Sequence, residues 1–233
     1  MRRRGNRVAG MQEEYRALVT TDLSQPRLRK ERKGNADKRR RQVLDAAYRS
    51  IMTHGLSRTT LATIAAEAGL SQGVAVFYFK SKSGVLTEAL RDLYEVYTAH
   101  WREALAASGD DPVAQLHAIV TADFDPKVCN PQVLSVWFAF WGEQSFIPSY
   151  TEITQDYAAH RTAAINDICR RLIPESREKA EDIALWVDTF TDGLWQNLHL
   201  SPDTISREAS RDATLRLLAA LLPEHSERLL PKP

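Results

Sequence analysis

The sequence from Leu70 to Leu86 reads LSQGVAVFYFKSKSGVL, and it decides the fold. It follows a short apolar segment that ends at Gly69, and glycine commonly ends helices in the left-handed conformation. Ser71 is placed to cap a new helix over 72–79. Two short helices joined by a tight turn are the pattern of a helix-turn-helix. We therefore predict this motif at about residues 60–79.

The rest of the chain also shows helical periodicity. Val43, Leu44, Ala47 and Ile51 form an apolar stripe that predicts a first helix over 37–53. Further helices are predicted at 82–107, 113–124, 131–145, 149–172, 177–199 and 203–222. The fold class that follows is all-α, with an N-terminal three-helix helix-turn-helix domain and a C-terminal helical domain.

Charge is distributed unevenly along the chain. Residues 1–41 carry 14 Lys and Arg against 5 Asp and Glu, whereas residues 42–233 carry 17 against 25. A basic arm before an acidic body indicates that a polyanion meets one end of the protein, although a solvated tail has the same composition. We expect residues 1–36 to be a disordered basic arm. The run that ends in Arg41 adjoins a helix and is better placed to contact phosphate.

Composition excludes several classes of protein. No apolar run approaches the ~18 residues of a spanning helix, and the N-terminus shows no signal-peptide pattern. We therefore expect no membrane contact and a cytoplasmic location. Cys129 and Cys169 are too few for a disulfide framework or a multi-thiolate zinc site. We expect no metal and no cofactor.

The second helix of the motif is suited to reading DNA, because such a helix presents its N-terminal residues to base edges in the major groove. Gly73 has no side chain and lets the backbone approach DNA closely. Gln72 offers hydrogen bonds to bases, and Val74, Val76 or Phe77 offers an apolar contact to a thymine methyl. Phosphate contacts are expected from Tyr78, Lys80 and Lys82 and from the amide groups at the Ser71 helix start.

Residues 37–98 resemble the DNA-binding domain of the TetR family of bacterial repressors. The matching features are Gly55, then TTLxxIAxxAGLSxG over 59–73, then YFxxKxxxL over 78–86. The resemblance implies that Thr59 or Thr60, Tyr78 and Lys82 hold phosphates, and that Gln72, Gly73, Val74 and Phe77 lie nearest the bases. One departure is Val76, where many members have tyrosine, so the operator does not follow by analogy. Residues 99–233 are then expected to form a ligand-binding and dimerisation domain.

The second half is rich in aromatic residues at helical spacing. Trp137 and Trp141 are four residues apart, with Phe140 beside them, and Tyr97 and Trp101 form a second such pair. Asp192 and Trp195 share a helix face. Most aromatics at this spacing belong to a core, but nearby carboxylates would require a cationic partner, and indole faces attract cations. We predict a ligand site formed by these seven residues: Tyr97, Trp101, Trp137, Phe140, Trp141, Asp192 and Trp195.

Three segments, DFD at 123–125, VWFAFW at 136–141 and DGLW at 192–195, resemble a subgroup of the family. That subgroup represses glycine-betaine synthesis and responds to choline. The resemblance implies a dimeric repressor that binds a pseudo-palindromic DNA operator and is released by choline or a related quaternary ammonium compound. We expect the helices at 149–172 and 177–199 to form the dimer, as a four-helix bundle with their copies. Asp192 and Trp195 serve either the ligand site or that interface.

Other functions remain as alternatives. A regulator with the same scaffold can sense a different small ligand in another pathway. An α-helical adaptor for another protein is a remote second alternative, which the basic first helix and Gly73 disfavour. An enzyme is the least favoured, because the six histidines fall in no metal-ligand spacing and neither a nucleophile elbow nor a phosphate loop occurs. We therefore predict no catalytic residues.

Overall fold

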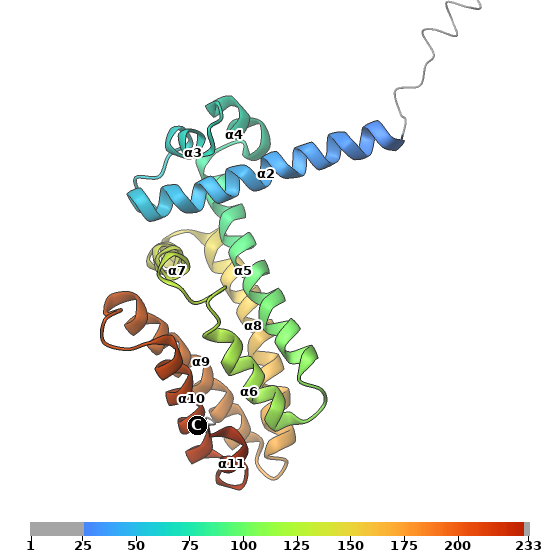
Figure 1. Cartoon of the computed structure of the whole chain (residues 1–233), viewed down its shortest axis with the longest axis vertical. Helices are drawn as coiled ribbons and strands as arrows, with labels where there is room; N and C mark the ends of the chain where they lie inside the picture. The colour runs from blue at the N-terminus through green and yellow to red at the C-terminus, as the bar shows by residue number, and fades with distance from the viewer. Residues whose placement is uncertain (1–25, 231–233) are drawn as a thin grey trace, which may run out of the picture. The chain divides into compact units, whose positions relative to one another are not determined.

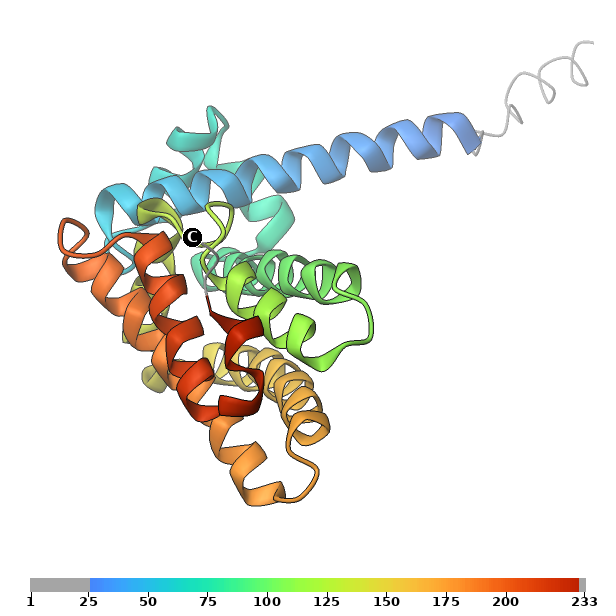
Figure 2. The same ribbon diagram turned by 60° about the horizontal axis from the view of Figure 1, so that its bottom comes forward.

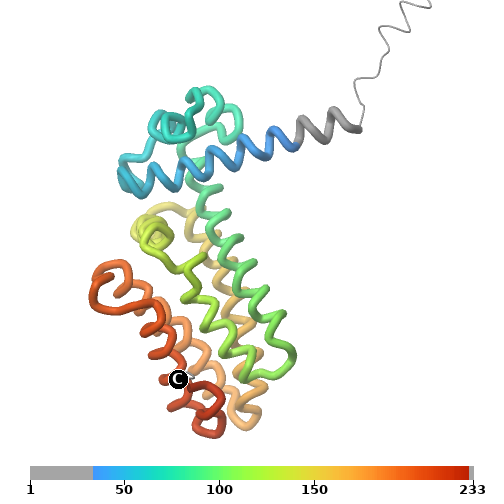
Figure 3. Tube along the Cα trace, in the orientation of Figure 1, coloured from blue at the N-terminus to red at the C-terminus, as the bar shows by residue number. Residues whose placement is uncertain are grey.

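The computed structural model of the chain describes residues 26–230, with side chains from Gly34 onward. Its path is traced in Figure 3. The chain divides into two units, one that ends at Gln42 and a larger one that begins at Val43. Helix α2 (Pro26–His54) contains residues of both units. The described residues contain helices and no strand, which confirms the all-α prediction.

The larger unit continues from α2 through a series of helices. In chain order they are α3 (Leu61–Ala68), α4 (Gln72–Phe79), α5 (Lys82–Ala107), α6 (Pro112–Asp123), α7 (Pro131–Glu143), the 3-10 turn η1 (Gln144–Phe146), α8 (Pro148–Leu172), α9 (Arg177–Leu200), α10 (Arg207–Leu221), the 3-10 turn η2 (Pro223–His225) and α11 (Ser226–Leu229).

Most predicted boundaries agree with these within a few residues, and two differ. Helix α2 begins at Pro26 rather than Asp37, because Leu, Arg, Lys and Glu favour helix strongly enough to offset the cost of Gly34, about 1 kcal/mol. The predicted disordered arm is therefore wrong for residues 26–36, and its remainder, 1–25, lies outside the described residues. The last long helix begins at Arg207 rather than residue 203, because the Ser206 hydroxyl caps it.

The helix-turn-helix packs on the first turns of α5. Ala47 and Ile51 of α2, Ile64 of α3 and Phe79 of α4 are all buried in the same apolar core. Figure 1 shows α3 and α4 beside the N-terminal end of α5. The tertiary contacts of α4 thus place the predicted DNA-reading helix at the N-terminal end of α5, which runs on into the C-terminal domain.

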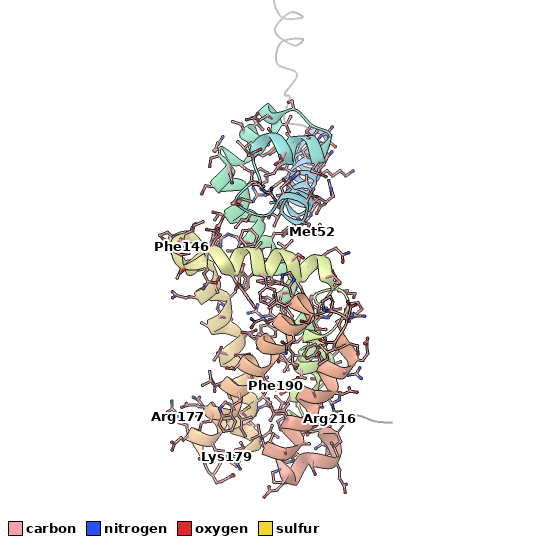
Figure 4. All side chains as sticks on the ribbon, turned by 90° about the vertical axis from the view of Figure 1, so that its left-hand side faces the viewer. Met52, Phe146, Arg177, Lys179, Phe190 and Arg216 are labelled. Carbon is pink, nitrogen blue, oxygen red and sulfur yellow. The ribbon has the colours of Figure 1, made fainter. Side chains whose placement is uncertain are left out.

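The C-terminal domain is a bundle in which α5, α6, α8, α9 and α10 lie side by side (Figures 1 and 2). Helix α7 lies across the bundle at the end nearer the helix-turn-helix, as Figure 4 shows. Its Trp137 and Phe140 are buried in the core. Cys129 and Cys169 are buried and form no disulfide.

Within residues 26–230, no single helix is long and apolar enough to cross a membrane; the sharply bent pair α3 and α4 meets that test jointly, by length and composition only.

Candidate functional site

The helix-turn-helix is built by local capping. Thr60 caps α3 by accepting a hydrogen bond from the Thr63 amide at 3.1 Å, and the Thr63 hydroxyl in turn accepts from the Thr60 amide at 2.9 Å. Gly69 ends α3 with φ +62°, a left-handed conformation that glycine adopts without strain. The chain then starts α4, whose axis is bent by 110° from that of α3. This is the angle range of helix-turn-helix pairs.

The predicted base-facing residues lie at the surface. Ser71, Gln72, Gly73 and Phe77 are exposed, and Val74 is half-buried. Phe77 is 70% exposed, which is a high value for a phenylalanine in a folded protein. The Ser71 hydroxyl makes no capping hydrogen bond, so the first amides of α4 have no side-chain cap. An exposed, uncapped helix start of this kind is suited to meeting an anion.

Thr59 is a correction to the predicted phosphate contacts. Its side chain is fully buried, and its hydroxyl donates to the Gly55 carbonyl at 2.9 Å. The loop that leaves Gly55 folds this threonine inward and turns Thr60 outward, where Thr60 is exposed. Thr60 therefore remains the predicted contact, and Thr59 holds the loop.

Two positions near the motif, Gly73 and Gly84, have glycine for different reasons. A Cβ on Gly73 would meet only the Ser71 Oγ, at 3.8 Å, so no packing inside the chain requires glycine there. A Cβ on Gly84 would lie 2.1 Å from the Phe79 carbonyl oxygen, so glycine is required for α4 to approach α5. The absence of an internal reason for Gly73 agrees with a role toward DNA.

Three of the remaining predicted phosphate contacts lie around the turn from α4 into α5, and the fourth, Arg41, lies in α2. Lys80 has φ +69°, a left-handed conformation that is costly for a residue with a side chain, and it turns the chain into α5. Its Nζ lies 5.9 Å from the Phe77 ring centroid. Tyr78 is half-buried with its ring 5.0 Å from that of Phe77, and the Lys82 Nζ donates to the Ser57 carbonyl at 2.9 Å. Arg41, which belongs to the smaller unit, is exposed.

The C-terminal domain encloses a cavity of about 430 Å³ among α5, α7, α8 and α9. Seven of its lining residues are aromatic, and most of the others are polar or charged. Trp137 lies at the centre of this cluster, with ring centroids 4.6 Å from Tyr94, 5.9 Å from Tyr97 and 5.9 Å from Trp141. The Trp195 ring is 5.6 Å from that of Tyr97. The volume lies within the range of small-molecule sites.

Most of the predicted ligand set lines this cavity. The lining includes Tyr97, Trp101, Trp137, Trp141, Asp192 and Trp195. Phe140 is not among the lining residues; it is buried against Tyr150 instead, with ring centroids 5.3 Å apart. Asp192 and Trp195 thus face the cavity within the protomer, whereas Gly193 between them lines a separate groove between α9 and α10.

An ion-pair network forms one wall. The Arg161 guanidinium of α8 contacts Asp123 of α6 at 2.5 Å and also pairs with Asp188 of α9. Asp123 accepts a second hydrogen bond from the Tyr97 hydroxyl at 2.7 Å. Burial raises the pKa of Asp123, and the Arg161 charge opposes that rise. The Tyr97 hydroxyl and the Arg161 guanidinium both donate to this buried carboxyl group, and both contacts favour its ionised form. The Arg161 charge is therefore shared between two carboxylates.

Asp192 lies beside this network with no cation of its own among the ion pairs found in residues 34–230. Asp192 is exposed to solvent at the edge of the residues that line the cavity, although neighbouring protein atoms still partly desolvate its carboxylate. Burial raises its pKa from 3.8 to about 6, and the nearby Asp123 adds to the rise while Arg161 opposes it. At neutral pH the cavity therefore carries an ionised carboxylate that lacks a counter-ion.

Sequence reasoning did not identify Arg161 as a site residue. A signal was present, because Ile153, Tyr157, Arg161, Ile165 and Ile168 recur every three or four residues along α8. Arg161 therefore interrupts an apolar stripe, and a charge in such a position requires a buried partner. Asp188 and Asp123 on other helices supply it.

The fold and these two sites define a ligand-sensing regulator that binds DNA through a helix-turn-helix. Comparison with protein families agrees: residues 43–89 match the bacterial regulatory proteins of the tetR family, and residues 112–223 match the C-terminal domain of BetI-type transcriptional repressors. The chain is 32% identical over 185 residues to the HTH-type transcriptional regulator BetI of Stenotrophomonas maltophilia, covering 77% of this chain and 91% of that relative. The chain belongs to the TetR family of bacterial transcriptional regulators, with a BetI-type C-terminal domain.

Solved structures show the same fold. A transcriptional regulator of Pseudomonas aeruginosa PAO1 matches with a TM-score of 0.73 at 23% identity, over 83% of this chain and 94% of that one. A regulator of Saccharomonospora viridis, solved in complex with choline, matches with a TM-score of 0.70 at 22% identity, over 78% of this chain and 96% of that one. Regulators of this family bind operator DNA as dimers and respond to small-molecule effectors, and they are not enzymes.

Proposed function

We propose that this protein is a homodimeric repressor of genes that convert choline to glycine betaine, and that choline releases it from its operator. The observation that carries the proposal is the cavity itself: aromatic walls surround a carboxylate, Asp192, that has no cationic partner in the described ion pairs. The BetI relatives and the choline-bound regulator of similar fold support the same ligand. A cytoplasmic location follows from the proposed DNA partner.

The chemistry of the walls favours a quaternary ammonium group. Such a group has a diffuse positive charge and no N–H donor, so it gains more from the faces of aromatic rings than from hydrogen-bond acceptors. Tyr97, Trp137 and Trp195 offer such faces around one space, and the Asp192 carboxylate supplies the opposite charge. A primary ammonium such as that of ethanolamine is a compact and strongly hydrated charge, so it loses more hydration than a quaternary group when it moves against aromatic faces.

The dimer face is a separate proposal, and it differs from the prediction. The exposed residues of α8 are mostly polar or charged, such as Gln155, Asp156 and His160. By contrast, α9 and α10 form an apolar groove lined by Trp186, Phe190, Leu194, Leu217 and Leu221 among others. Figure 4 turns this face to the viewer, with Phe190 of α9 and Arg216 of α10 labelled. We therefore assign the interface to α9 and α10, as a four-helix bundle with the partner.

Calorimetric titration of the purified protein with choline and with ethanolamine tests the ligand. Saturable binding of choline at sub-millimolar concentration, with ethanolamine at least roughly tenfold weaker, is the expected result. Equal binding of the two amines, or no binding of either, would contradict the proposal. It would favour the alternative, a TetR-family regulator that senses another ligand in a different pathway.

A further inference from the structure

Trp137 has a polar group that the protein leaves unused. Its side chain is 1% exposed and lines the cavity, yet its indole N–H has no hydrogen-bond partner among the described residues. A buried donor without an acceptor costs free energy, and such groups in native proteins usually have a specific reason. The indole N–H of Trp195, in the same cavity wall, shows the contrast, because it donates to the Asp123 carbonyl at 3.0 Å.

We propose that the Trp137 indole N–H is the donor that holds the polar tail of the ligand, so the cavity selects a monocation that carries a hydrogen-bond acceptor. This inference rests on the proposed function and deepens it. The aromatic faces and Asp192 recognise the charged head, which any quaternary ammonium supplies. The Trp137 donor adds a second requirement, which tetramethylammonium does not meet and choline meets with its hydroxyl oxygen.

The charges of the cavity require that this acceptor be neutral. Arg161 lines the cavity, but its guanidinium already pairs with Asp123 and Asp188. Asp192 adds a further negative charge. A carboxylate tail would therefore meet like charges, with no unshared cation in the lining to balance them. A hydroxyl or carbonyl oxygen accepts from the indole N–H without this repulsion.

The test compares choline with tetramethylammonium on the wild type and on Trp137→Phe by calorimetry. A single neutral hydrogen bond predicts that the wild type prefers choline by roughly three- to tenfold. In Trp137→Phe this preference falls to about one, because the aromatic ring remains and the donor is lost. A merely structural role of Trp137 would weaken both ligands by the same factor and leave the preference intact, and that result would overturn the inference.

A second substitution guards against loss of packing. Replacing Trp137 with benzothienylalanine keeps the size of the indole ring and exchanges the N–H for sulfur, and circular dichroism verifies the fold. The same collapse of preference is expected, and persistence of the preference in this variant would also overturn the inference. If neither ligand binds the wild type, the proposed function itself fails and the inference falls with it. Choline binding with an unchanged preference refutes only the role of Trp137.

Discussion

Replacing Asp192 with asparagine removes the unbalanced charge of the cavity while preserving the size of the side chain. The substitution is expected to weaken choline binding and, without ligand, to stabilise the fold. These two effects have opposite signs, and both follow from one carboxylate that is partly desolvated and has no ion-pair partner of its own among the described residues. Loss of packing would instead weaken binding and stability together.

The size of the binding effect follows from Coulomb attraction. A cation held about 5 Å from the Asp192 carboxylate gains about 3 kcal/mol at an effective dielectric constant of about 20. The cavity mouth admits solvent to this side chain, so screening reduces the gain to about 2 kcal/mol. The expected loss of choline affinity in Asp192→Asn is therefore roughly thirtyfold.

The sign of the stability effect follows from the pKa. Burial raises the pKa of Asp192 from 3.8 to about 6, so the folded protein holds this proton more tightly than the unfolded chain does. Above about pH 6 the ionised carboxylate costs folding free energy, and asparagine removes that cost. The unliganded variant should melt at a higher temperature than the wild type near neutral pH. The difference should shrink as the pH falls through 6 toward 4.

The assay combines calorimetry with choline and thermal melting without it, each from about pH 7.5 to about pH 5. Wild-type affinity should weaken over this range, because Asp192 takes up a proton as the pH falls through about 6. Asp192→Asn should show little pH dependence. Asp182→Asn, an aspartate of the same helix that does not line the cavity, is the matched control. Unchanged choline affinity in Asp192→Asn would refute the electrostatic reasoning.

Three further outcomes are expected. Gly84→Ala should destabilise the fold by about 2 kcal/mol in denaturant melts, because its Cβ would lie 2.1 Å from the Phe79 carbonyl oxygen. Gly73→Ala should leave the stability of the fold equal or slightly higher, and it should weaken operator binding in an anisotropy assay. Equal stability losses in the two variants would contradict this contrast. Phe190→Asp should convert the dimer to a monomer in light scattering, since a carboxylate in the α9–α10 groove would be buried without a partner; a stable dimer would move the interface elsewhere. Glycine betaine should bind at least roughly tenfold more weakly than choline in calorimetry, because Arg161 is already paired, and comparable affinities would show that the cavity tolerates a carboxylate.

Local signals made the helix-turn-helix predictable from sequence. Gly69 and Ser71 set the turn, and the observed α4 begins and ends at the predicted residues. Which of two adjacent threonines faces outward was not predictable. The answer depends on the path of the loop from Gly55, which buries Thr59 and exposes Thr60.

The cavity was predictable in type but not in detail. Helical spacing brought most of the aromatic lining together, because residues four apart share a face. Phe140 lies on α7 with Trp137 and Trp141, but it packs against Tyr150 of α8 instead of lining the cavity. Only the placement of α8 beside α7 determines this contact. The break in the apolar stripe of α8 marks Arg161, but its partners Asp123 and Asp188 lie on other helices, so no local pattern contains the whole network. The close approach of Gly84 to the Phe79 carbonyl likewise depends on how α4 packs against α5, which the sequence pattern does not show.

The central claim is that choline in this cavity controls DNA binding. The most direct test is fluorescence anisotropy with labelled DNA from upstream of the choline-oxidation genes of the source genome, measured with and without about 1 mM choline on the wild type and Asp192→Asn. The account predicts tight, salt-dependent binding that choline releases in the wild type, with roughly thirtyfold more choline needed in the variant. Operator binding that saturating choline leaves unchanged in the wild type would contradict it.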